Sequence, residues 1–475
     1  MNLSKSKYIH LLIMIALMFG ISFCPPFGQI TPYGMKALGA FVGVLYGWIA
    51  FDLMWSSIFG FFALGALGLK TVVGSFQSGI GDPMIITVLL SMSFAVAIDM
   101  MGVTEFIANW LLKQKALRKS PWYLIAGIMF IGYAIGLAGA SMAGIFLLWA
   151  IVMRIAKLCE FPKYDPLISF VIMAITVSTI SAAMVWPFKG GGLMFLAYMY
   201  QVTELRFATA PFIIFANTVT ILLVVCLFLF AKYILRLDAS KFVLPDEILA
   251  EIDARKSTRK QKVGFIIAIM YILVLILPSI FSFPGAAYIN KLGIVGINAL
   301  ALLIPAILKI DGEAMISIPK VFPRVDWTML LLLAVTYPLA EVMRSADSGI
   351  MPTIMAAVGP ALAKLGPTVL IIMAMIVLGT ITQFTHNIVM AAMFMPFLLP
   401  IVAEMGGNIF TMWFILFLVL NMAYCTPAGS FQAALVFGNE EMNKKYAYIF
   451  GIAYLVIGWV ILGFVGIPLG NMLFK

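Results

Sequence analysis

Charged side chains are scarce in this chain of 475 residues. Lysine, arginine, aspartate and glutamate make up 11% of it, whereas a soluble domain carries about 25%. Hydrophobic residues make up 63%, and a soluble protein of this length would need a far more polar surface. The apolar runs are continuous over roughly 17–25 residues, which is typical of membrane helices rather than of β-barrel strands. Composition therefore predicts an all-α polytopic membrane protein.

Cysteine and histidine are also sparse, with four cysteines and two histidines. The cysteines are scattered without paired spacing, which excludes a disulfide framework and a cysteine metal motif. We find no nucleotide-binding motif, catalytic triad, metal-ligand cluster or pair of carboxylates placed for acid–base chemistry. These absences argue against an enzyme, an ATP-driven pump and a bound cofactor.

Long apolar segments follow one another along the chain. We predict about eleven transmembrane helices, near residues 9–24, 36–50, 53–68, 83–101, 165–200, 210–234, 263–281, 288–308, 326–343, 409–437 and 447–470. Two further regions hold paired apolar runs that small and polar residues interrupt. The interruptions are GLAGASMAG (136–144) within residues 122–158 and GTITQFTHN (379–387) within residues 367–403. We predict that both regions are re-entrant helical hairpins, which enter and leave the membrane on one side.

Basic residues are distributed unevenly between the two sides that this arrangement creates. With the N-terminus in the cytoplasm, 22 lysines and arginines fall inside and seven outside, while Lys189 belongs to neither side. This asymmetry follows the positive-inside rule, so it explains the net charge of +10 without nucleic acid as a partner. It predicts a cytoplasmic start for the N-terminal helix (residues 1–35) and an external C-terminus. The short loops favour a bacterial inner membrane.

A basic stretch at residues 236–262 divides the chain into two similar halves. In residues 36–235 the hairpin precedes a span (165–200) that WPFKGGG interrupts. In residues 263–475 it precedes a span (409–437) that CTPAGS interrupts. An odd number of spans per half gives the two copies opposite orientations. Inverted repeats with matched interrupted helices are typical of secondary transporters, whose site lies near the bilayer midplane. A channel is an alternative that the matched breaks disfavour.

The remaining charged segments have simpler interpretations. The dividing stretch is predicted to be a solvated cytoplasmic loop beside anionic lipid, and its ILAEIDARK segment (248–256) to form a surface helix. The acids within apolar segments, Asp52, Asp99 and Glu341, are predicted to be ion-pair partners or span-end residues.

Two motifs in the second half resemble those of a known family. TQFTHNIVMAAMFMPFLLPI (382–401) is similar to the second hairpin of the divalent anion/sodium symporters, which include dicarboxylate, citrate and sulfate transporters of the ion-transporter superfamily. That hairpin is commonly written T-E-F-T-S-N-T, so His386 stands at the serine, Asn387 at the asparagine and Ile388 at the threonine. NMAYCTPAGSFQAALVFGNEE (421–441) resembles the break that follows it.

The first half matches the same pattern more loosely. GLAGASMAGIFLLWAI (136–151) has no asparagine at its tip, and WPFKGGGL (186–193) keeps the glycines but adds Lys189. The resemblance implies an elevator-type homodimer, in which a mobile domain with both hairpins and both broken helices slides along a fixed scaffold. It also implies di- and tricarboxylates or sulfate as substrates, moved by sodium symport or by exchange.

Broken helices predict where an anion would bind. Unpaired backbone N–H groups and helix N-termini attract anions, and free carbonyls at the adjoining helix ends can hold sodium. We expect the tips and breaks to surround one cavity, because irregular backbone at membrane depth must be buried or line a cavity. The predicted substrate-binding residues are Ser141, Lys189, Gly190, Gly191, Thr385, His386, Asn387, Thr426, Pro427 and Ser430. A sodium ion is expected near Thr382, Asn387 and Ala428.

Several of these residues also have a purely structural interpretation. Asn387 could cap the second hairpin helix, and Thr426 and Ser430 could satisfy the backbone at the proline-associated break. Placing the charged side chain of Lys189 at membrane depth costs about 2.5–3.5 kcal/mol of insertion free energy. The cost is avoided if the side chain reaches an interface or pairs with Glu341 or Asp99.

Lys189 and His386 bear on ion coupling, together with Asn387. The Lys189 ammonium could replace one sodium ion or pair with a substrate carboxylate. His386 could be a packed structural residue, or it could couple transport to protons, because its ring titrates near neutral pH. The coupling ion is therefore sodium or a proton, or there is none and the transporter exchanges anions.

The sequence thus favours an elevator transporter for a small organic anion, most simply a di- or tricarboxylate, with the lipid bilayer as its setting. One alternative is a transporter of sulfate or another oxyanion. A second is a membrane component that keeps the scaffold without transporting.

Overall fold

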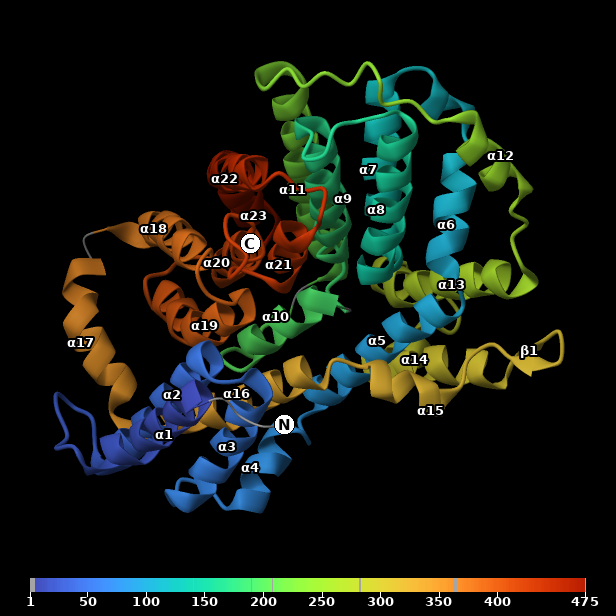
Figure 1. The fold of residues 1–475 in the computed structure, drawn as a ribbon. Helices are drawn as coiled ribbons and strands as arrows, with labels where there is room; N and C mark the ends of the chain where they lie inside the picture. The colour runs from blue at the N-terminus through green and yellow to red at the C-terminus, as the bar shows by residue number, and fades with distance from the viewer. Residues whose placement is uncertain are drawn as a thin grey trace.

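The computed structural model describes residues 5–139, 141–188, 190–206, 208–281, 283–362 and 365–474, and these are mainly helical (Figure 1). The α-helices of the first half are α1 (Lys5–Gly20), α2 (Pro32–Ala50), α3 (Leu53–Ala66), α4 (Val72–Gly79), α5 (Pro83–Met100), α6 (Val103–Leu112), α7 (Pro121–Ala138), α8 (Ser141–Leu158), α9 (Pro166–Ala183), α10 (Gly190–Tyr200) and α11 (Thr209–Leu229). Those that follow are α12 (Asp246–Ala254), α13 (Arg259–Ile280), α14 (Ala286–Ile307), α15 (Ile318–Val321), α16 (Trp327–Arg344), α17 (Ile350–Leu362), α18 (Gly366–Ile381), α19 (Asn387–Glu404), α20 (Ile409–Leu420), α21 (Phe431–Gly438), α22 (Lys444–Ile461) and α23 (Ile467–Leu473).

Shorter elements complete the described chain. Two π-helical turns, Phe230–Ile234 and Leu462–Gly466, continue α11 and α22. The 3₁₀ turns are Ile21–Phe23, Lys115–Arg118, Phe322–Arg324 and Ala346–Ser348. Strands β1 (Lys309–Ile310) and β2 (Glu313–Ala314) form an antiparallel hairpin after α14, which the sequence analysis did not predict.

Several helices begin at the same local signal, a capping side chain followed by proline. The caps Thr31, Asp82, Ser120 and Asp165 each accept a hydrogen bond from a backbone N–H in the first turn of α2, α5, α7 and α9. Proline fits the first helical position because its missing N–H would be unpaired there anyway. Asp52 caps α3 in the same way, accepting from the N–H of Trp55 at 2.9 Å. It is a span-end residue, as predicted.

Eleven helices of the described chain are long and apolar enough to cross a membrane, which agrees with the predicted number. Nine coincide with predicted spans, but the membership differs at four places. Leu53–Ala66 and Ile409–Leu420 are shorter than a span, whereas the hairpin arms Pro121–Ala138 and Asn387–Glu404 reach full length. The number therefore agrees only because two hairpin arms take the place of α3 and α20.

The second half repeats the order of elements of the first. A helical hairpin (α7 and α8) precedes α9, a break and α10, and a second hairpin (α18 and α19) precedes α20, a break and α21. In both halves the two hairpin arms pack on the helix that follows them, α9 or α20. The halves also interlock, because α3 packs against α16 and α5 against α14. The opposite orientation of the halves in the membrane, and re-entrance of the hairpins, stay predictions.

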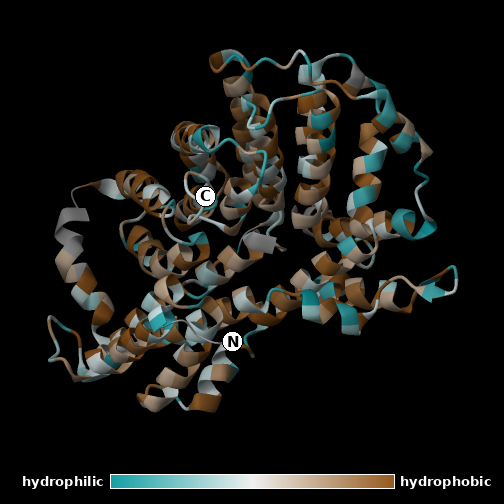
Figure 2. Ribbon diagram, viewed as in Figure 1, coloured by the Kyte–Doolittle hydropathy of each residue, from teal (hydrophilic) through white to brown (hydrophobic). Residues whose placement is uncertain are grey.

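The helices that precede the two breaks lie deepest in the protein. In the span α9, 89% of the residues are buried, against 17% in α13 and 11% in α1. In α20, Trp413, Phe414 and Phe417 are fully buried and contact aromatic rings of α10 and α11. Figure 2 shows apolar residues along nearly all the helices, while polar ones gather at α12 and at the β-hairpin. The breaks are therefore anchored by the core, and the outer helices supply the surface that lipid can cover.

The basic loop is more structured than predicted. It contains α12, which covers most of the predicted surface helix, but Ile248 and Ile252 are buried. Arg154 on α8 forms ion pairs with Glu247, at 3.0 Å, and with Glu251. The loop is therefore tied to the first hairpin rather than merely solvated, because α12 has an apolar face and an acidic face.

Candidate functional site

The tip of the second hairpin consists of residues 382–386, between α18 and α19. His386 is the N-cap of α19, and its Nδ1 accepts a hydrogen bond from the N–H of Ile388 at 3.3 Å. The side-chain oxygen of Asn387 accepts from the same N–H at 2.9 Å. The cap that was considered for Asn387 is thus shared with His386. An Nδ1 that accepts a hydrogen bond carries no proton, so this geometry corresponds to the neutral imidazole.

Asn387 connects the tip to the break between α20 and α21. Its side-chain amide donates to the side-chain oxygen of Asn421 at 3.0 Å, and its backbone N–H donates to the carbonyl of Gly429 at 3.3 Å. Asn421 in turn donates to the carbonyl of Phe417, within α20, at 2.7 Å. Asn387 is 7% exposed. Its partner Asn421 is half-buried. Asn387 begins α19 and Asn421 follows the end of α20, so both residues adjoin irregular backbone.

Gln383 is the central residue of this junction, and the sequence analysis did not single it out. Its side chain is buried and donates to the carbonyls of Gly379, at 2.8 Å, and Met422, at 3.2 Å. It also accepts from the N–H of Cys425 at 2.9 Å. Unpaired buried backbone groups cost about 1–3 kcal/mol each, so one glutamine keeps the broken helix satisfied. The sequence signal that could have identified Gln383 is a single glutamine between two apolar segments.

The hydroxyls of the break are occupied by structural hydrogen bonds. Thr426 donates to the carbonyl of Gln383 and accepts from the N–H of Ala428. Ser430 donates to the carbonyl of Ala423 at 2.9 Å and caps α21 by accepting from the N–H of Ala433 at 3.1 Å. The structural interpretation of both residues therefore holds, and any ligand contact would have to share or replace these bonds.

The other predicted residues of the second half lie close by in the chain but differ in burial. Thr382 is buried and donates to the carbonyl of Leu420 at 3.4 Å. Thr385 is half-buried, and no side-chain hydrogen bond joins it to the described part of the chain. Pro427 and Ala428 are exposed. The structure thus bonds Thr382 and Asn387 to the end of α20 and to the break, whereas His386 caps α19. Pro427 and Ala428 lie at the surface of the break.

The first hairpin is joined to its break by other means. Gly139, with φ 98°, ends α7, and the indole N–H of Trp186 in the break donates to the carbonyl of Leu137 at 2.8 Å. A Cβ on Gly136 would lie 2.1 Å from the carbonyl oxygen of Thr179, so only glycine allows α7 to approach α9 this closely. The first tip and break therefore also meet, through close packing.

Several predicted residues of the first half cannot be placed in the same detail. Lys189 lies outside the described residues, and the side chain of Ser141 does too; Gly190 and Gly191 begin α10. The two acids considered as partners of Lys189 each have a partner within the described chain. Glu341 forms an ion pair with Lys70 at 2.7 Å, and Asp99 accepts from the hydroxyl of Thr104 at 3.0 Å.

The two halves meet through α10. This helix follows the first break and packs against α19 and α20 of the second half. The indole N–H of Trp413 on α20 donates to the carbonyl of Phe195 on α10 at 2.9 Å. Across the described residues, no group of three or more histidine, cysteine or acidic side chains is placed to hold a metal ion. A single cavity shared by both tips stays a prediction.

This arrangement defines an all-α polytopic membrane protein, and comparison with known proteins supports that class. The fold is similar to that in the crystal structure of the YdaH transporter of Alcanivorax borkumensis, with a TM-score of 0.54 and 14% identity. The similarity covers 86% of this chain and 90% of that one. No curated protein matches the sequence.

The sequence model described as "Citrate transporter" matches residues 41–421. The chain therefore belongs to the citrate transporter family and is a secondary transporter, which confirms the predicted resemblance. The matched residues include both hairpins and the first break. They stop before Thr426, Pro427 and Ser430.

Proposed function

We propose that this transporter carries a small di- or tricarboxylate by symport or exchange, in an elevator movement. The observation that carries the proposal is the polar junction of the second half, where Gln383, Asn387 and Asn421 connect a hairpin tip to a broken helix. Uncharged donors at such a junction can exchange their internal hydrogen bonds for bonds to carboxylate oxygens. The helix N-termini of α19 and α21 add partial positive charge beside them. The citrate transporter family supports a carboxylate over an inorganic oxyanion.

The proposed binding residues are those that line the two tips and breaks. In the second half they are Thr385, His386 and Asn387, with Thr426, Pro427 and Ser430 from the break. In the first half Ser141, Lys189, Gly190 and Gly191 supply a hydroxyl, a charge and small residues that allow close approach. We place sodium, if it is the coupling ion, near Thr382, Asn387 and Ala428, where backbone carbonyls end a helix.

A ligand-stabilisation screen tests the substrate. The thermal unfolding of the purified protein is measured with citrate, succinate or sulfate, each with sodium and with potassium. We expect the tricarboxylate or the dicarboxylate to raise the unfolding temperature, and Asn387→Ala to abolish the shift. A shift with sulfate alone would replace the carboxylate by an oxyanion. No shift with any anion would favour a component that does not transport.

The coupling role proposed for Lys189 has its own test. If its ammonium replaces a sodium ion or pairs with the substrate, transport is insensitive to sodium and is lost in Lys189→Gln. Uptake is compared in sodium and in potassium for the parent and the variant. Strict dependence on two or more sodium ions per cycle would contradict this role. A homodimer and cytoplasmic N-terminus complete the proposal and are tested by cross-linking and by site-specific labelling.

A further inference from the structure

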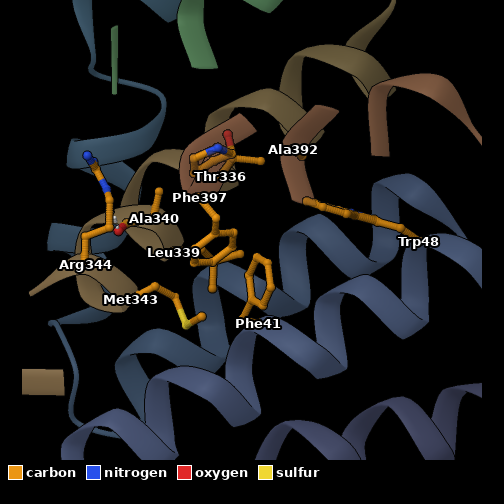
Figure 3. A pocket seen from close by; sticks show the side chains of 10 residues that line it. Phe41, Trp48, Thr336, Leu339, Ala340, Met343, Arg344, Ala392 and Phe397 are labelled. Atoms are coloured by element: carbon orange, nitrogen blue, oxygen red, sulfur yellow. Dashed lines mark hydrogen bonds between the residues drawn. The ribbon is translucent and has the colours of Figure 1, made fainter. Parts of the chain in front are cut away.

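Hydroxyl side chains in the membrane-spanning helices commonly donate a hydrogen bond within their own helix. Thr336, which lines the small cavity drawn in Figure 3, donates to the carbonyl of Leu333 at 2.6 Å. Ser93 on α5 donates to the carbonyl of Leu89 at 2.8 Å. Such donation satisfies the hydroxyl proton locally. Ser91, two residues before Ser93 on the same helix, is different, because its hydroxyl donates to another segment of the chain.

The acceptor of the Ser91 hydroxyl is the carbonyl of Phe188, at 3.2 Å, and both residues are buried. Phe188 belongs to the first break, which lies after α9 ends at Ala183 and before α10 begins at Gly190. Its carbonyl is therefore outside both helices, where a buried backbone group needs another partner. The hydrogen bond from Ser91 holds the break against α5 at this point.

Two further buried polar side chains support Ser91. The hydroxyl of Tyr271 on α13 lies close enough to that of Ser91 to interact with it, and it donates to the side-chain oxygen of Asn298 on α14 at 2.7 Å. The amide nitrogen of Asn298 donates to the carbonyl of Thr87, on α5, at 3.3 Å. Because a carbonyl only accepts, this bond fixes the orientation of the Asn298 amide, and Tyr271 must be the donor to its oxygen. We call these three side chains the Ser91–Tyr271–Asn298 network.

The network also has a purely structural interpretation. Polar side chains hold membrane helices together through hydrogen bonds, and α5, α13 and α14 pack against one another. The network does not end between these helices, however, because Ser91 bonds to the backbone of the break. Tyr271 contacts the break as well, since its ring centroid lies 6.3 Å from that of Phe188. These two contacts indicate that the network places the break.

We propose that Tyr271 and Asn298 are positioning residues, which hold the backbone of the first break in place through Ser91. Ser91 has one hydroxyl proton and two acceptors near it, the carbonyl of Phe188 and the oxygen of Tyr271. If the break moves away, the proton turns to Tyr271 and stays bonded. The residue that follows Phe188 in the sequence is Lys189, one of the proposed binding residues, so displacement of the break weakens substrate binding. That effect rests on the proposed function, whereas the restraint on the break does not.

Hydrogen–deuterium exchange of the purified full-length protein tests the restraint without substrate or a transport assay. Ser91→Ala removes the donor to the break, and Tyr271→Phe keeps the ring and removes only its hydroxyl. We expect backbone amides of residues 184–193 to exchange roughly fivefold faster in both variants. Tyr46→Phe is the matched control, because the Tyr46 hydroxyl bonds to His10 at 2.8 Å, between α1 and α2. Unchanged exchange of residues 184–193 in Ser91→Ala and Tyr271→Phe would overturn the proposal.

Counterflow of labelled citrate separates positioning from simple stabilisation. We expect Tyr271→Phe to raise KM roughly fivefold, and Tyr46→Phe to leave it unchanged even if both variants unfold at a lower temperature. Ser91→Thr keeps a hydroxyl and should retain the KM of the parent. A parental KM in Tyr271→Phe would contradict the positioning role and leave the network as a bond between helices. If Tyr271→Phe fails to fold, Ser91→Ala carries the test. Absence of counterflow in the parent protein would contradict the proposed function, and the exchange experiment would still decide the restraint.

Discussion

The two junctions between hairpin tip and broken helix have the same arrangement but are stabilised differently. In the second half, Gln383, Asn387 and Thr426 bond the tip to the break with side-chain amides and a hydroxyl. In the first half, an indole bonds to a backbone carbonyl, and Gly136 lets α7 approach the backbone of α9. Across the described residues, one junction is held mainly by polar side chains and the other mainly by close packing.

This difference indicates that the two junctions have different roles, one in ligand binding and one in fixing geometry. A polar junction can give up internal hydrogen bonds to a ligand and regain them when the ligand leaves, because amides both donate and accept. A steric junction offers no such exchange, so it fixes the geometry of the first hairpin. Any charge that the first half contributes to an anion would have to come from Lys189, the one ionisable residue of its break.

The largest expected effect comes from removing the centre of the polar junction. Gln383→Leu leaves the N–H of Cys425 and the carbonyl of Met422 unpaired in a buried place, so we expect a loss of about 3 kcal/mol or more in unfolding free energy. Denaturant or thermal unfolding in detergent measures it. Gln77→Leu on α4 is the control, since Gln77 is exposed. Equal stability of the two variants would show that the junction is not held by Gln383.

The steric junction is tested by one methyl group. Gly136→Ala places a Cβ against the carbonyl of Thr179, and overpacking of this kind costs about 1–3 kcal/mol. Alanine would otherwise favour a helix by about 0.5–1 kcal/mol, so the sign of the change is informative. Gly20→Ala, where nothing lies within 4 Å of the added Cβ, should be neutral or slightly stabilising. Stabilisation in Gly136→Ala would contradict the close approach.

The two roles considered for His386, as a helix cap and as a titrating group, can be tested separately. Asparagine is a strong N-cap, so His386→Asn should keep the stability of the protein within about 0.5 kcal/mol. If the ring couples transport to protons, the pH dependence of uptake flattens in this variant, because asparagine does not titrate. An unchanged pH profile would leave His386 as a cap alone.

The smallest effect is expected at the exposed ion pairs between α12 and the first hairpin. Hydrogen bonds from Arg154 and then Arg255 lower the pKa of Glu251. Because this pKa is lowered, the ion pairs stabilise the folded protein at pH values above the ordinary pKa of a glutamate. This stabilisation is lost as the pH falls through the lowered pKa. Glu251→Gln should therefore lower the unfolding temperature slightly at neutral pH and not at acidic pH. High salt should remove the difference, since both groups are exposed.

The sequence predicted the fold well because long apolar runs and their polar interruptions are local signals. It predicted α12, the two hairpins as helix pairs and both breaks within a few residues. It did not predict that the hairpin arms reach full span length while α20 stops after 12 residues. Helix length at a break depends on where tertiary hydrogen bonds take over the backbone, and spacing in the sequence does not encode that point.

The site was predicted only in part, for the same reason. Asn387 and His386 stand out as polar residues in an apolar run, and both lie at the tip. Gln383 was missed because its importance depends on Met422 and Cys425, some 40 residues away along the chain. Thr426 and Ser430 were assigned to substrate from their place at the break, with backbone hydrogen bonding as the alternative, and the structure shows that each hydroxyl has backbone partners.

Counterflow of labelled citrate in proteoliposomes tests the central claim most directly. Vesicles preloaded with unlabelled citrate should accumulate labelled citrate transiently with the wild-type protein. Asn387→Ala should lose this accumulation while remaining folded, because the loss of its two side-chain hydrogen bonds, to Asn421 and from the N–H of Ile388, costs only about 2 kcal/mol and His386 still accepts from that N–H. Wild-type counterflow in Asn387→Ala would contradict the assignment of the site to the polar junction. Absence of counterflow for citrate and for every dicarboxylate tested, with folded wild-type protein, would contradict the proposed function.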